Sequence, residues 1–344
     1  MPTKTSLVIT SISPPNPVLL SYGEESRRNG VDFIVIGDVK SPRDFNLAGC
    51  DFWSIERQRK LGFQLAKTLP ERHYARKNLG YLIAMERGAE IIIETDDDNF
   101  PKEEFWQERS AFHAANLAEQ AGWINVYRYF TDVPVWPRGF PLEYTKKQVV
   151  SLDSFPERES FCPIQQGLAD GNPDVDAVYR LVMPLPVSFS ARPRLILGRA
   201  TWSPFNSQNT TWFKAAFPLL YIPSYCNFRM CDIWRSFVAL RICWANGWGV
   251  LFHGPTVWQE RNDHNLLEDF QDEVVGYINN ARICEALEKL DIKTGSSNIG
   301  ENMRKCYQAL VDMGVVGTGE MALLDDWMSD IGRQGGACKG TRNV

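Results

Sequence analysis

The sequence predicts an α/β fold, with a Rossmann-like, mostly parallel sheet flanked by helices and a helical addition at its C-terminal end. Two observations support this prediction. Apolar strands alternate with helical segments through the first hundred residues, and from about residue 265 the pattern is helical only. A chain of 344 residues is long enough for one large domain or two ordinary ones.

The first three predicted strands are short apolar runs. The first is "SLVITSI" (6–12), which is followed by the turn-rich "SPPNP". The second is "VDFIVIGD" (31–38), and the third is "DFWSI" (51–55). In a doubly wound sheet ligands bind beyond the carboxyl ends of the strands, so Asp38 lies at a candidate binding edge.

Two helices and a fourth strand follow. Residues 56–69, "ERQRKLGFQLAKTL", place leucines at i, i+4 and i+8, which is one stripe of a helix. Residues 75–88, "ARKNLGYLIAMERG", form a second helical pattern with a glycine as its stop. The run "AEIIIETDDD" (89–98) is then a fully apolar strand that ends in carboxylates.

The second half is less regular until its helical end. Residues 130–230 are rich in Pro, Trp and Phe and predict irregular structure with short strands. We expect a helix from about Asp232 to Asn246 and another strand at "WGVLFHG" (248–254). The predicted domains are an α/β domain over 1–264, a helical extension over 265–332 and a disordered tail over 333–344.

Charge and composition argue against two classes of partner. The net charge of −5 gives no electrostatic support to a nucleic-acid partner. No apolar run approaches the ~18 residues that a membrane span needs, and the N-terminus is too short and too polar for a signal peptide. We therefore expect a cytoplasmic chain without an integral membrane segment, and a homo-oligomer is an open alternative to a monomer.

Three successive carboxylates, Asp96 to Asp98, directly follow the fourth strand. One alternative is helix capping by Asp98 or Asn99, but a cap needs only one side chain. Hard cations such as Mn²⁺ or Mg²⁺ bind carboxylate oxygens and share them with a substrate's phosphates. The sequence therefore predicts a metal site at Asp96 and Asp98, with Asp97 assisting in binding the substrate.

Three classes of metal-using protein carry such a motif. An EF-hand needs a glycine where Pro101 stands. A phosphatase of the aspartyl-phosphate type would want a small β-branched residue where this chain has Phe100. The third class is the nucleotide-sugar glycosyltransferases, whose Asp-x-Asp motif holds a metal against the diphosphate.

Two cations precede the acidic strand. Arg76 and Lys77 lie at or near the N-terminus of the predicted helix, where cations oppose the helix dipole. A diphosphate bound nearby would relieve that conflict, so both are candidate nucleotide-binding residues. The alternative is that they are solvated surface charges.

The run "YARKNLGYLIAMERGAEIIIETDDDNFP" resembles the STELLO family. Further resemblance covers "GDVKSPRDFNLAGCDFWSIERQRKLGF", "QGLADGNPDVDAVYRL", "SPFNSQNTTWF" and "RMCDIWRS", so that it extends over most of residues 6–260. STELLO proteins are similar to glycosyltransferases of the GT-A fold. A weaker similarity leads to the reversibly glycosylated polypeptides, which also carry an aspartate triplet.

The resemblance implies a GT-A-like enzyme that takes a nucleotide-diphospho sugar, most simply a UDP-sugar, with Mn²⁺ or Mg²⁺, and a glycan acceptor. It places Asp38 against the base or ribose, although a turn aspartate after a glycine is common. By the same analogy, Thr10 and Ser11 belong to the base-binding loop, and Lys40 reaches a base or phosphate.

The acceptor side is expected in the second half of the chain. Asp170, Asp174 and Asp176 lie in the family-like block near Arg180. Asp232 is either the N-cap of its helix or the general base of an inverting transfer, and both roles can hold together.

His253 and His264 are candidates to complete the metal shell, as a histidine does in some GT-A enzymes, although lone histidines are more often structural. The tryptophans of the second half are candidate sugar platforms, and most are expected in the core. The alternatives to a glycosyltransferase are a nucleotide-sugar mutase and a non-catalytic scaffold of a glycosyltransferase complex.

Overall fold

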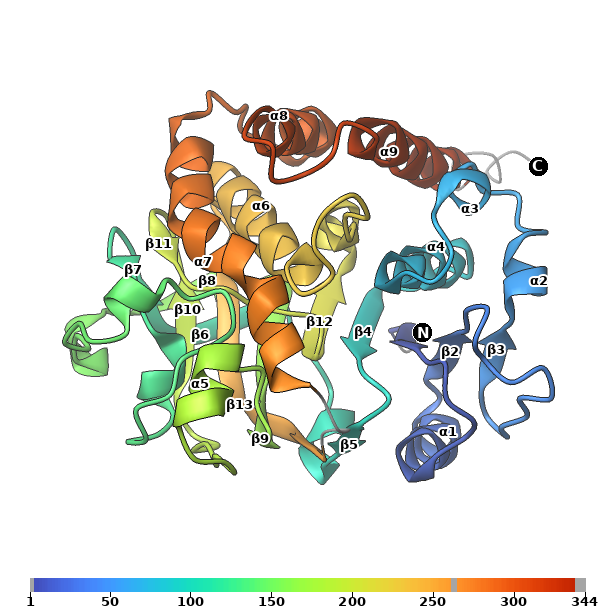
Figure 1. Cartoon of the computed structure of the whole chain (residues 1–344), viewed down its shortest axis with the longest axis horizontal. Helices are drawn as coiled ribbons and strands as arrows, with labels where there is room; N and C mark the ends of the chain where they lie inside the picture. Colours follow the sequence, from blue (N-terminus) through green and yellow to red (C-terminus); the bar gives the residue numbers. More distant parts are fainter. Residues whose placement is uncertain (1–2, 261–264, 338–344) are drawn as a thin grey trace.

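The structure is a computed structural model that describes residues 3–260 and 265–337. Its centre is an eleven-stranded sheet with the strand order β3-β2-β1-β4-β12-β9-β13-β10-β6-β8, and β5 pairs with β13 off this path (Figure 1). Most strands run in the same direction and helices lie on both faces. The predicted α/β fold with a mostly parallel sheet and a helical C-terminal part is therefore confirmed.

The N-terminal half of the sheet is fully parallel. It contains β1 (Thr5–Thr10), β2 (Asp32–Ile36), β3 (Asp51–Trp53) and β4 (Ile91–Thr95). The chain passes from β1 to β2 on one side and reaches β4 on the other, so the strand order reverses between β1 and β4. Ligands of such sheets bind at the carboxyl ends of the strands beside this switch point.

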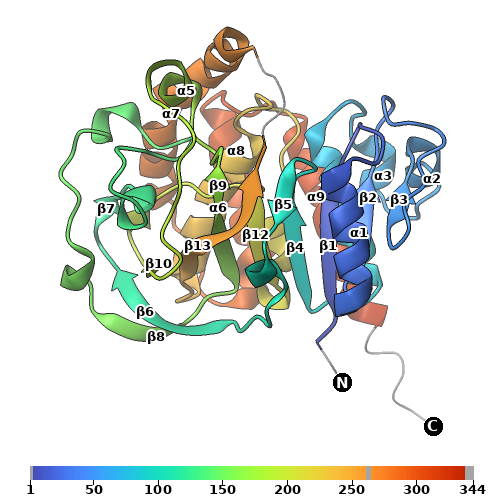
Figure 2. The same cartoon turned by 90° about the horizontal axis from the view of Figure 1, so that it is seen from below.

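Two helices cover opposite faces of this half. Helix α1 (Pro17–Asn29), which lies beside β1 in Figure 2, packs on Leu7 and Ile9. Helix α4 (Lys77–Glu86) lies on the other face, where it packs on Val8 (Figure 1). The prediction missed α1, because "SPPNP" was read as a turn. Asn16 is its N-cap and accepts the Leu19 N–H at 2.9 Å, while Pro17 occupies the first helical position, where its missing N–H costs nothing.

The single helix predicted over 56–69 is wrong. The segment forms two short helices, α2 (Ile55–Gln58) and α3 (Leu65–Thr68). The second begins where the carboxylate of Asp330, far along the chain, accepts the N–H groups of Gln64 and Leu65, each at 2.9 Å. A tertiary contact therefore sets this helix start.

The second half of the sheet is mixed. Strand β12 (Asn209–Phe213) lies antiparallel between β4 and β9 (Ile164–Gly171), and β13 (Val250–Gln259) continues parallel to β9. The short strands predicted within residues 130–230 are present, whereas the short strand predicted at 248–254 begins at Val250 and is longer than expected. The remaining strands are β5 (Asn99–Pro101), β6 (Phe112–Ala118), β7 (Gly122–Trp123), β8 (Glu157–Phe161), β10 (Arg194–Leu197) and β11 (Thr201–Trp202).

The C-terminal part consists of α7 (Leu266–Lys289), α8 (Ile299–Asp312) and α9 (Glu320–Ala337). Figure 1 shows α8 and α9 running one after the other along one side of the molecule, from α7 to α3. The tail predicted to be disordered over 333–344 is helical to Ala337, and its remainder, 338–344, lies outside the described residues. The short helix α5 (Ala177–Val182) packs against α7.

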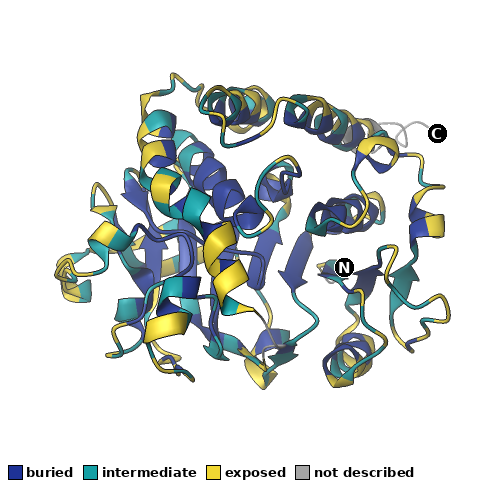
Figure 3. Cartoon of the chain, in the orientation of Figure 1, coloured by how far each residue is buried: buried dark blue, intermediate teal, exposed yellow. Residues whose placement is uncertain are grey.

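Helix α6 (Cys231–Ala245) is almost entirely buried under α7 and α8 (Figure 3). Its Arg235 forms an ion pair with Glu94 of β4 at 2.7 Å, and both side chains are buried. The Trp212 indole N–H also donates to Glu94, at 2.8 Å. This internal pair attaches α6 to the strand that carries the acidic cluster. No helix in the described part of the chain is both long and apolar enough to cross a membrane.

Candidate functional site

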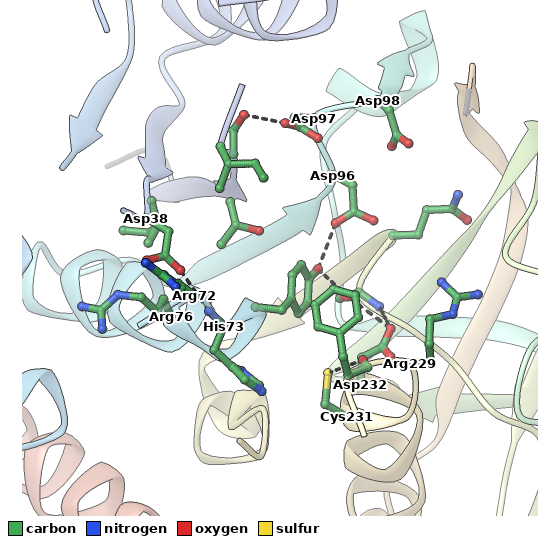
Figure 4. A pocket seen from close by; sticks show the side chains of 18 of the residues that line it. Asp38, Arg72, His73, Arg76, Asp96, Asp97, Asp98, Arg229, Cys231 and Asp232 are labelled. Atoms are coloured by element: carbon green, nitrogen blue, oxygen red, sulfur yellow. Dashed lines mark hydrogen bonds between the residues drawn. The ribbon is translucent and has the colours of Figure 1, made fainter. Parts of the chain in front are cut away.

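A cavity of about 480 Å³ opens at the carboxyl ends of β1, β2 and β4. This is the switch-point position, and the volume is within the usual range for a small-molecule site. The predicted residues that line it are Thr10, Ser11, Asp38, Lys40, Arg76, Asp96, Asp97, Asp98, Asp174, Arg180 and Asp232. In Figure 4, Asp38, Arg72 and Arg76 lie on one side and Arg229 and Asp232 on the other, with Asp96 between them.

The three carboxylates of the acidic cluster diverge from one another (Figure 4). Asp97 accepts the hydroxyl of Ser11 at 2.5 Å, and Asp98 accepts the side-chain amide of Gln259 at 2.9 Å. Burial raises the pKa of Asp96 and Asp97, and burial together with the Asp96 charge raises the pKa of Asp98 to about 7. Burial of adjacent carboxyl groups therefore disfavours their charged forms.

Lys77 is the cation nearest to this cluster, and it is fully buried. Its ammonium donates to the Thr95 carbonyl and to the Tyr74 hydroxyl, each at 2.8 Å, and lies 3.4 Å from the Asp96 carboxylate. The Tyr74 hydroxyl in turn donates to Asp96 at 2.9 Å and lies 2.6 Å from the Ser207 hydroxyl. Lys77 and Tyr74 thus hold the Asp96 carboxylate in place through side-chain contacts. The expectation that Lys77 faces the nucleotide is not supported by this geometry.

Arg76 is also buried, with an exposed fraction of 2%, so the interpretation as a solvated surface charge is wrong. Its Nε donates to Gln58 at 2.7 Å, and one terminal nitrogen donates to the Leu69 carbonyl at 3.1 Å. Burial lowers its pKa. Arg76 therefore holds the loop after α3 in place, and this loop forms part of the cavity wall.

The free cations on this side are Lys40 and Arg72. Both are exposed at the cavity, and within the described ranges neither pairs with another side chain. Arg72 has a left-handed backbone φ of 57°, which is strained for a residue with a Cβ and is typical of functional sites. The Asp38 carboxylate, on the same side of the cavity, accepts the backbone N–H of Val39 at 2.7 Å and of His73 at 2.9 Å.

The opposite wall is built on Arg138, whose guanidinium is buried and bridges two carboxylates. Its Nε and one terminal nitrogen donate to Asp174, each at 2.8 Å. Its two terminal nitrogens donate to Asp232 at 3.1 and 2.9 Å. Sequence reasoning missed Arg138 because it lies in the Pro-rich stretch, where no local pattern marks it.

The alternative that Asp232 caps its helix is wrong. The cap position is Met230, which makes no side-chain bond, and Asp232 lies in the first turn of α6. Its carboxylate also accepts the Ile233 N–H at 3.0 Å and the Ser207 hydroxyl at 3.2 Å. Arg138 lowers the pKa of Asp232 to about 2 against the effect of burial. A carboxylate with this many donors is poorly placed to take a proton from a substrate.

Several other candidates lie away from the cavity. Asp170 pairs with Lys102 outside it, and Asp176 is the N-cap of α5, where it accepts the Tyr179 N–H at 2.7 Å. His253 is half-buried in β13 with Nδ1 2.9 Å from the Gly254 carbonyl, and burial lowers its pKa to about 4. His264 lies outside the described residues. The cavity lining contains no tryptophan among the residues described.

The sequence prediction missed the cavity-lining residues Arg72, His73, Tyr74, Arg138, Phe228, Arg229 and Gln259. A signal existed for Tyr74, which directly precedes the two cations in the family-like run "YARKN". For Phe228 and Arg229, the signal was their position just before the predicted helix at Asp232.

The acidic cluster suits a hard divalent cation that shares its shell with phosphates. No group of three or more His, Cys, Asp or Glu side chains in the described part of the chain is arranged to hold a metal alone. Mg²⁺, however, is usually bound through one or two carboxylates plus substrate phosphates and water. Asp96, Asp97 and Asp98 all line the cavity, with the Lys77 ammonium 3.4 Å from Asp96, so a divalent cation bound here would offset the repulsion between the carboxylates.

Comparisons with known proteins agree with the sequence resemblance. A family model described as STELLO glycosyltransferases matches residues 229–337. "Probable glycosyltransferase STELLO2" of Arabidopsis thaliana is 29% identical over 280 residues, which cover 75% of this chain and 36% of that protein. "Probable glycosyltransferase STELLO1" of the same plant is 26% identical over 324 residues, or 88% of this chain and 41% of that protein.

The chain is similar to the STELLO glycosyltransferases. It spans about two fifths of the length of these two STELLO proteins. The STELLO family model covers α6 to α9, so the match includes the helices that frame one side of the cavity. Among solved structures, one titled "Crystal Structure of a Mycobacterial Protein" is similar with a TM-score of 0.40 and 11% sequence identity, over 92% of this chain and 77% of that chain.

Proposed function

We propose that this STELLO relative is a metal-dependent glycosyltransferase. It transfers a sugar from a nucleotide-diphospho sugar, with a UDP-sugar as the first donor to test, to a hydroxyl group of a glycan acceptor. The observation that supports this most is the position of Asp96, Asp97 and Asp98, which follow β4 at the switch point inside a cavity of about 480 Å³. The kinship with proteins named as glycosyltransferases supports the same class of reaction.

The donor nucleotide is proposed to lie on the β1–β2 side. Ile12 and Val39 are exposed apolar side chains in the cavity lining and suit the faces of a flat base. Asp38 keeps acceptor capacity for a ribose hydroxyl or a base N–H. Lys40 and Arg72 provide positive charge for phosphate oxygens. The sequence analysis had assigned this role to Arg76 and Lys77.

The metal is proposed to bind at Asp96 and Asp98, with Mn²⁺ or Mg²⁺ as the candidates. When bound, it would neutralise the charge of the diphosphate leaving group. Lys77 and Tyr74 hold Asp96 in place, Gln259 orients Asp98, and Ser11 turns Asp97 toward the base-binding loop.

A base is needed on the acceptor side if the transfer inverts configuration. The sequence suggested Asp232, but its oxygens already accept bonds from Arg138, Ile233 and Ser207. In the described residues each oxygen of the Asp174 side chain accepts one bond, both from Arg138, and Asp174 lines the same cavity. We therefore propose Asp174 as the residue that takes the proton of the acceptor hydroxyl.

Calorimetry of UDP binding with Mn²⁺ and with EDTA tests the proposal. Binding should weaken at least tenfold in EDTA, and Asp98→Asn should abolish most of the metal effect. Asp153→Asn, which changes an exposed aspartate away from the cavity, should not alter binding. Equal affinity in Mn²⁺ and EDTA would contradict the metal site, and absence of UDP binding would favour the scaffold alternative. A screen of UDP-sugars for slow hydrolysis would then identify the donor sugar.

A further inference from the structure

One large aromatic side chain at the cavity is left uncovered. Phe228 lines the cavity and is 56% exposed, although an aromatic ring gains from burial. Its ring packs edge-on against Tyr74, with centroids 6.0 Å apart and an interplanar angle of 84°. Tyr74 is the residue whose hydroxyl holds Asp96. Phe228 therefore presents an apolar surface close to the proposed reaction centre.

The backbone around Phe228 is fixed rather than loose. The Phe228 carbonyl accepts a hydrogen bond from the Cys231 thiol at 3.1 Å. The Arg229 backbone N–H donates to the side-chain oxygen of Asn227 at 2.8 Å. The carbonyl of Arg229 accepts a hydrogen bond from Arg138. Through Arg138, the segment that carries Phe228 is connected to the Asp174 carboxylate.

The charges on this wall are compensated. Arg138 is shared by two carboxylates, as described above. Arg229 donates to Glu273 through Nε at 3.0 Å, and its side chain is largely buried. Arg180 donates to the neutral Pro173 carbonyl at 2.8 Å, and its charge acts on the nearby Asp176 carboxylate. An acceptor carboxylate, sulfate or phosphate would therefore meet carboxylates at least as often as cations, and binding it here would be disfavoured.

We propose that this wall is the acceptor subsite and that it binds an uncharged pyranose. The apolar face of the sugar ring lies on Phe228, and its hydroxyl groups face the Asp174 carboxylate. This inference rests on the proposed glycosyltransferase function and goes beyond it, because it selects neutral glycan acceptors over acidic ones.

Saturation-transfer NMR on the full chain, with UDP and Mg²⁺ present, tests the inference. The probes are the methyl glycosides of glucose, galactose and mannose, compared with methyl glucuronide. Neutral glycosides should bind with millimolar affinity and methyl glucuronide at least tenfold more weakly. Phe228→Ala should weaken binding of the neutral glycosides about tenfold, and Phe228→Trp should retain it.

Phe112→Ala is the matched control, because Phe112 is a similarly exposed ring that is not part of the cavity lining. Equal or tighter binding of the glucuronide would overturn the inference. So would the absence of binding by every neutral glycoside, or equal binding by the Phe228→Ala and Phe112→Ala variants. A matching loss of UDP-sugar affinity in Phe228→Ala would assign the ring to the donor instead. If the unaltered protein did not bind UDP, the proposed function itself would be wrong.

Discussion

Replacing Asp232 by asparagine separates a structural carboxylate from a catalytic one. Asp232 is 5% exposed and bonds both terminal nitrogens of Arg138. The ion pair lowers its pKa to about 2, against an ordinary value of 3.8. Because one pKa unit corresponds to about 1.4 kcal/mol, this carboxylate contributes roughly 2 kcal/mol to the free energy of unfolding at neutral pH. Asp232→Asn should lose about that amount, since Asp174 still compensates Arg138.

The pH dependence of this loss is set by the direction of the shift. A carboxyl with a lowered folded-state pKa stabilises the fold above its unfolded-state pKa, and the contribution disappears as pH falls through the folded-state value. The difference in unfolding free energy between the unaltered protein and Asp232→Asn should be constant from pH 7 to 5. It should fall to about half by pH 3. Urea unfolding followed by circular dichroism at these pH values measures it, with Asp153→Asn as a control that changes nothing.

Sugar transfer by the same variants gives the second readout. Asp232→Asn should keep transfer within about tenfold of normal, because its oxygens already accept hydrogen bonds from Arg138, Ser207 and Ile233. Asp174→Asn should reduce transfer by ~10²–10⁴-fold, the usual contribution of a general base, while UDP-sugar binding is preserved. If Asp232→Asn instead lost a hundredfold or more with unfolding free energy unchanged, Asp232 would be the base and the argument from its occupied oxygens would be wrong.

Four further substitutions probe the donor side and the interior. Lys40→Ala should weaken UDP binding about five- to tenfold by calorimetry, with an unchanged melting temperature. Arg76→Ala should lower the melting temperature, because its guanidinium is buried. A lower melting temperature for Lys40→Ala and weaker UDP binding alone for Arg76→Ala would refute the assignment of Lys40 to the ligand and of Arg76 to the fold. Tyr74→Phe should weaken Mn²⁺-dependent UDP binding about tenfold while binding measured in EDTA stays the same, since the hydroxyl that holds Asp96 is removed together with its bonds to Lys77 and Ser207. Glu94→Gln should cost about 3–5 kcal/mol in urea unfolding by breaking the buried pair with Arg235, and a loss below 1 kcal/mol would show the pair to be dispensable.

The parts of the site that the sequence predicted depend on local pattern. Asp38 and Asp96 follow apolar strands directly, and the carboxyl ends of neighbouring parallel strands meet at one edge of a sheet. The apolar runs fixed the strands, and the strands fixed the positions of these carboxylates. The same reasoning placed Ser11 after the first strand, where its hydroxyl reaches Asp97.

Burial of charge could not be predicted in the same way. Lys77 and Arg76 were expected to face a ligand because cations at a helix start attract anions. In the fold, Lys77 is paired with Asp96, and Arg76 binds Gln58 and a backbone carbonyl. Their partners lie in other elements, so only the tertiary structure shows that these cations bind protein groups and stabilise the site. Arg138 was missed for the same reason, because Asp232 lies 94 residues further along the chain.

The C-terminal helices illustrate how distant segments determine the site. Glu320, at the start of α9, is buried and accepts the Ser224 N–H at 2.9 Å and the Tyr225 N–H at 2.6 Å. Asp330, three turns later on α9, caps α3. The first contact fixes the loop that leads to Phe228, and the second fixes the segment that leads to Arg72. One helix therefore sets the positions of both cavity walls, because each of its buried carboxylates holds backbone N–H groups that would otherwise lack a partner. A region that reads in the sequence as a helical addition is thus part of the structure that shapes the cavity.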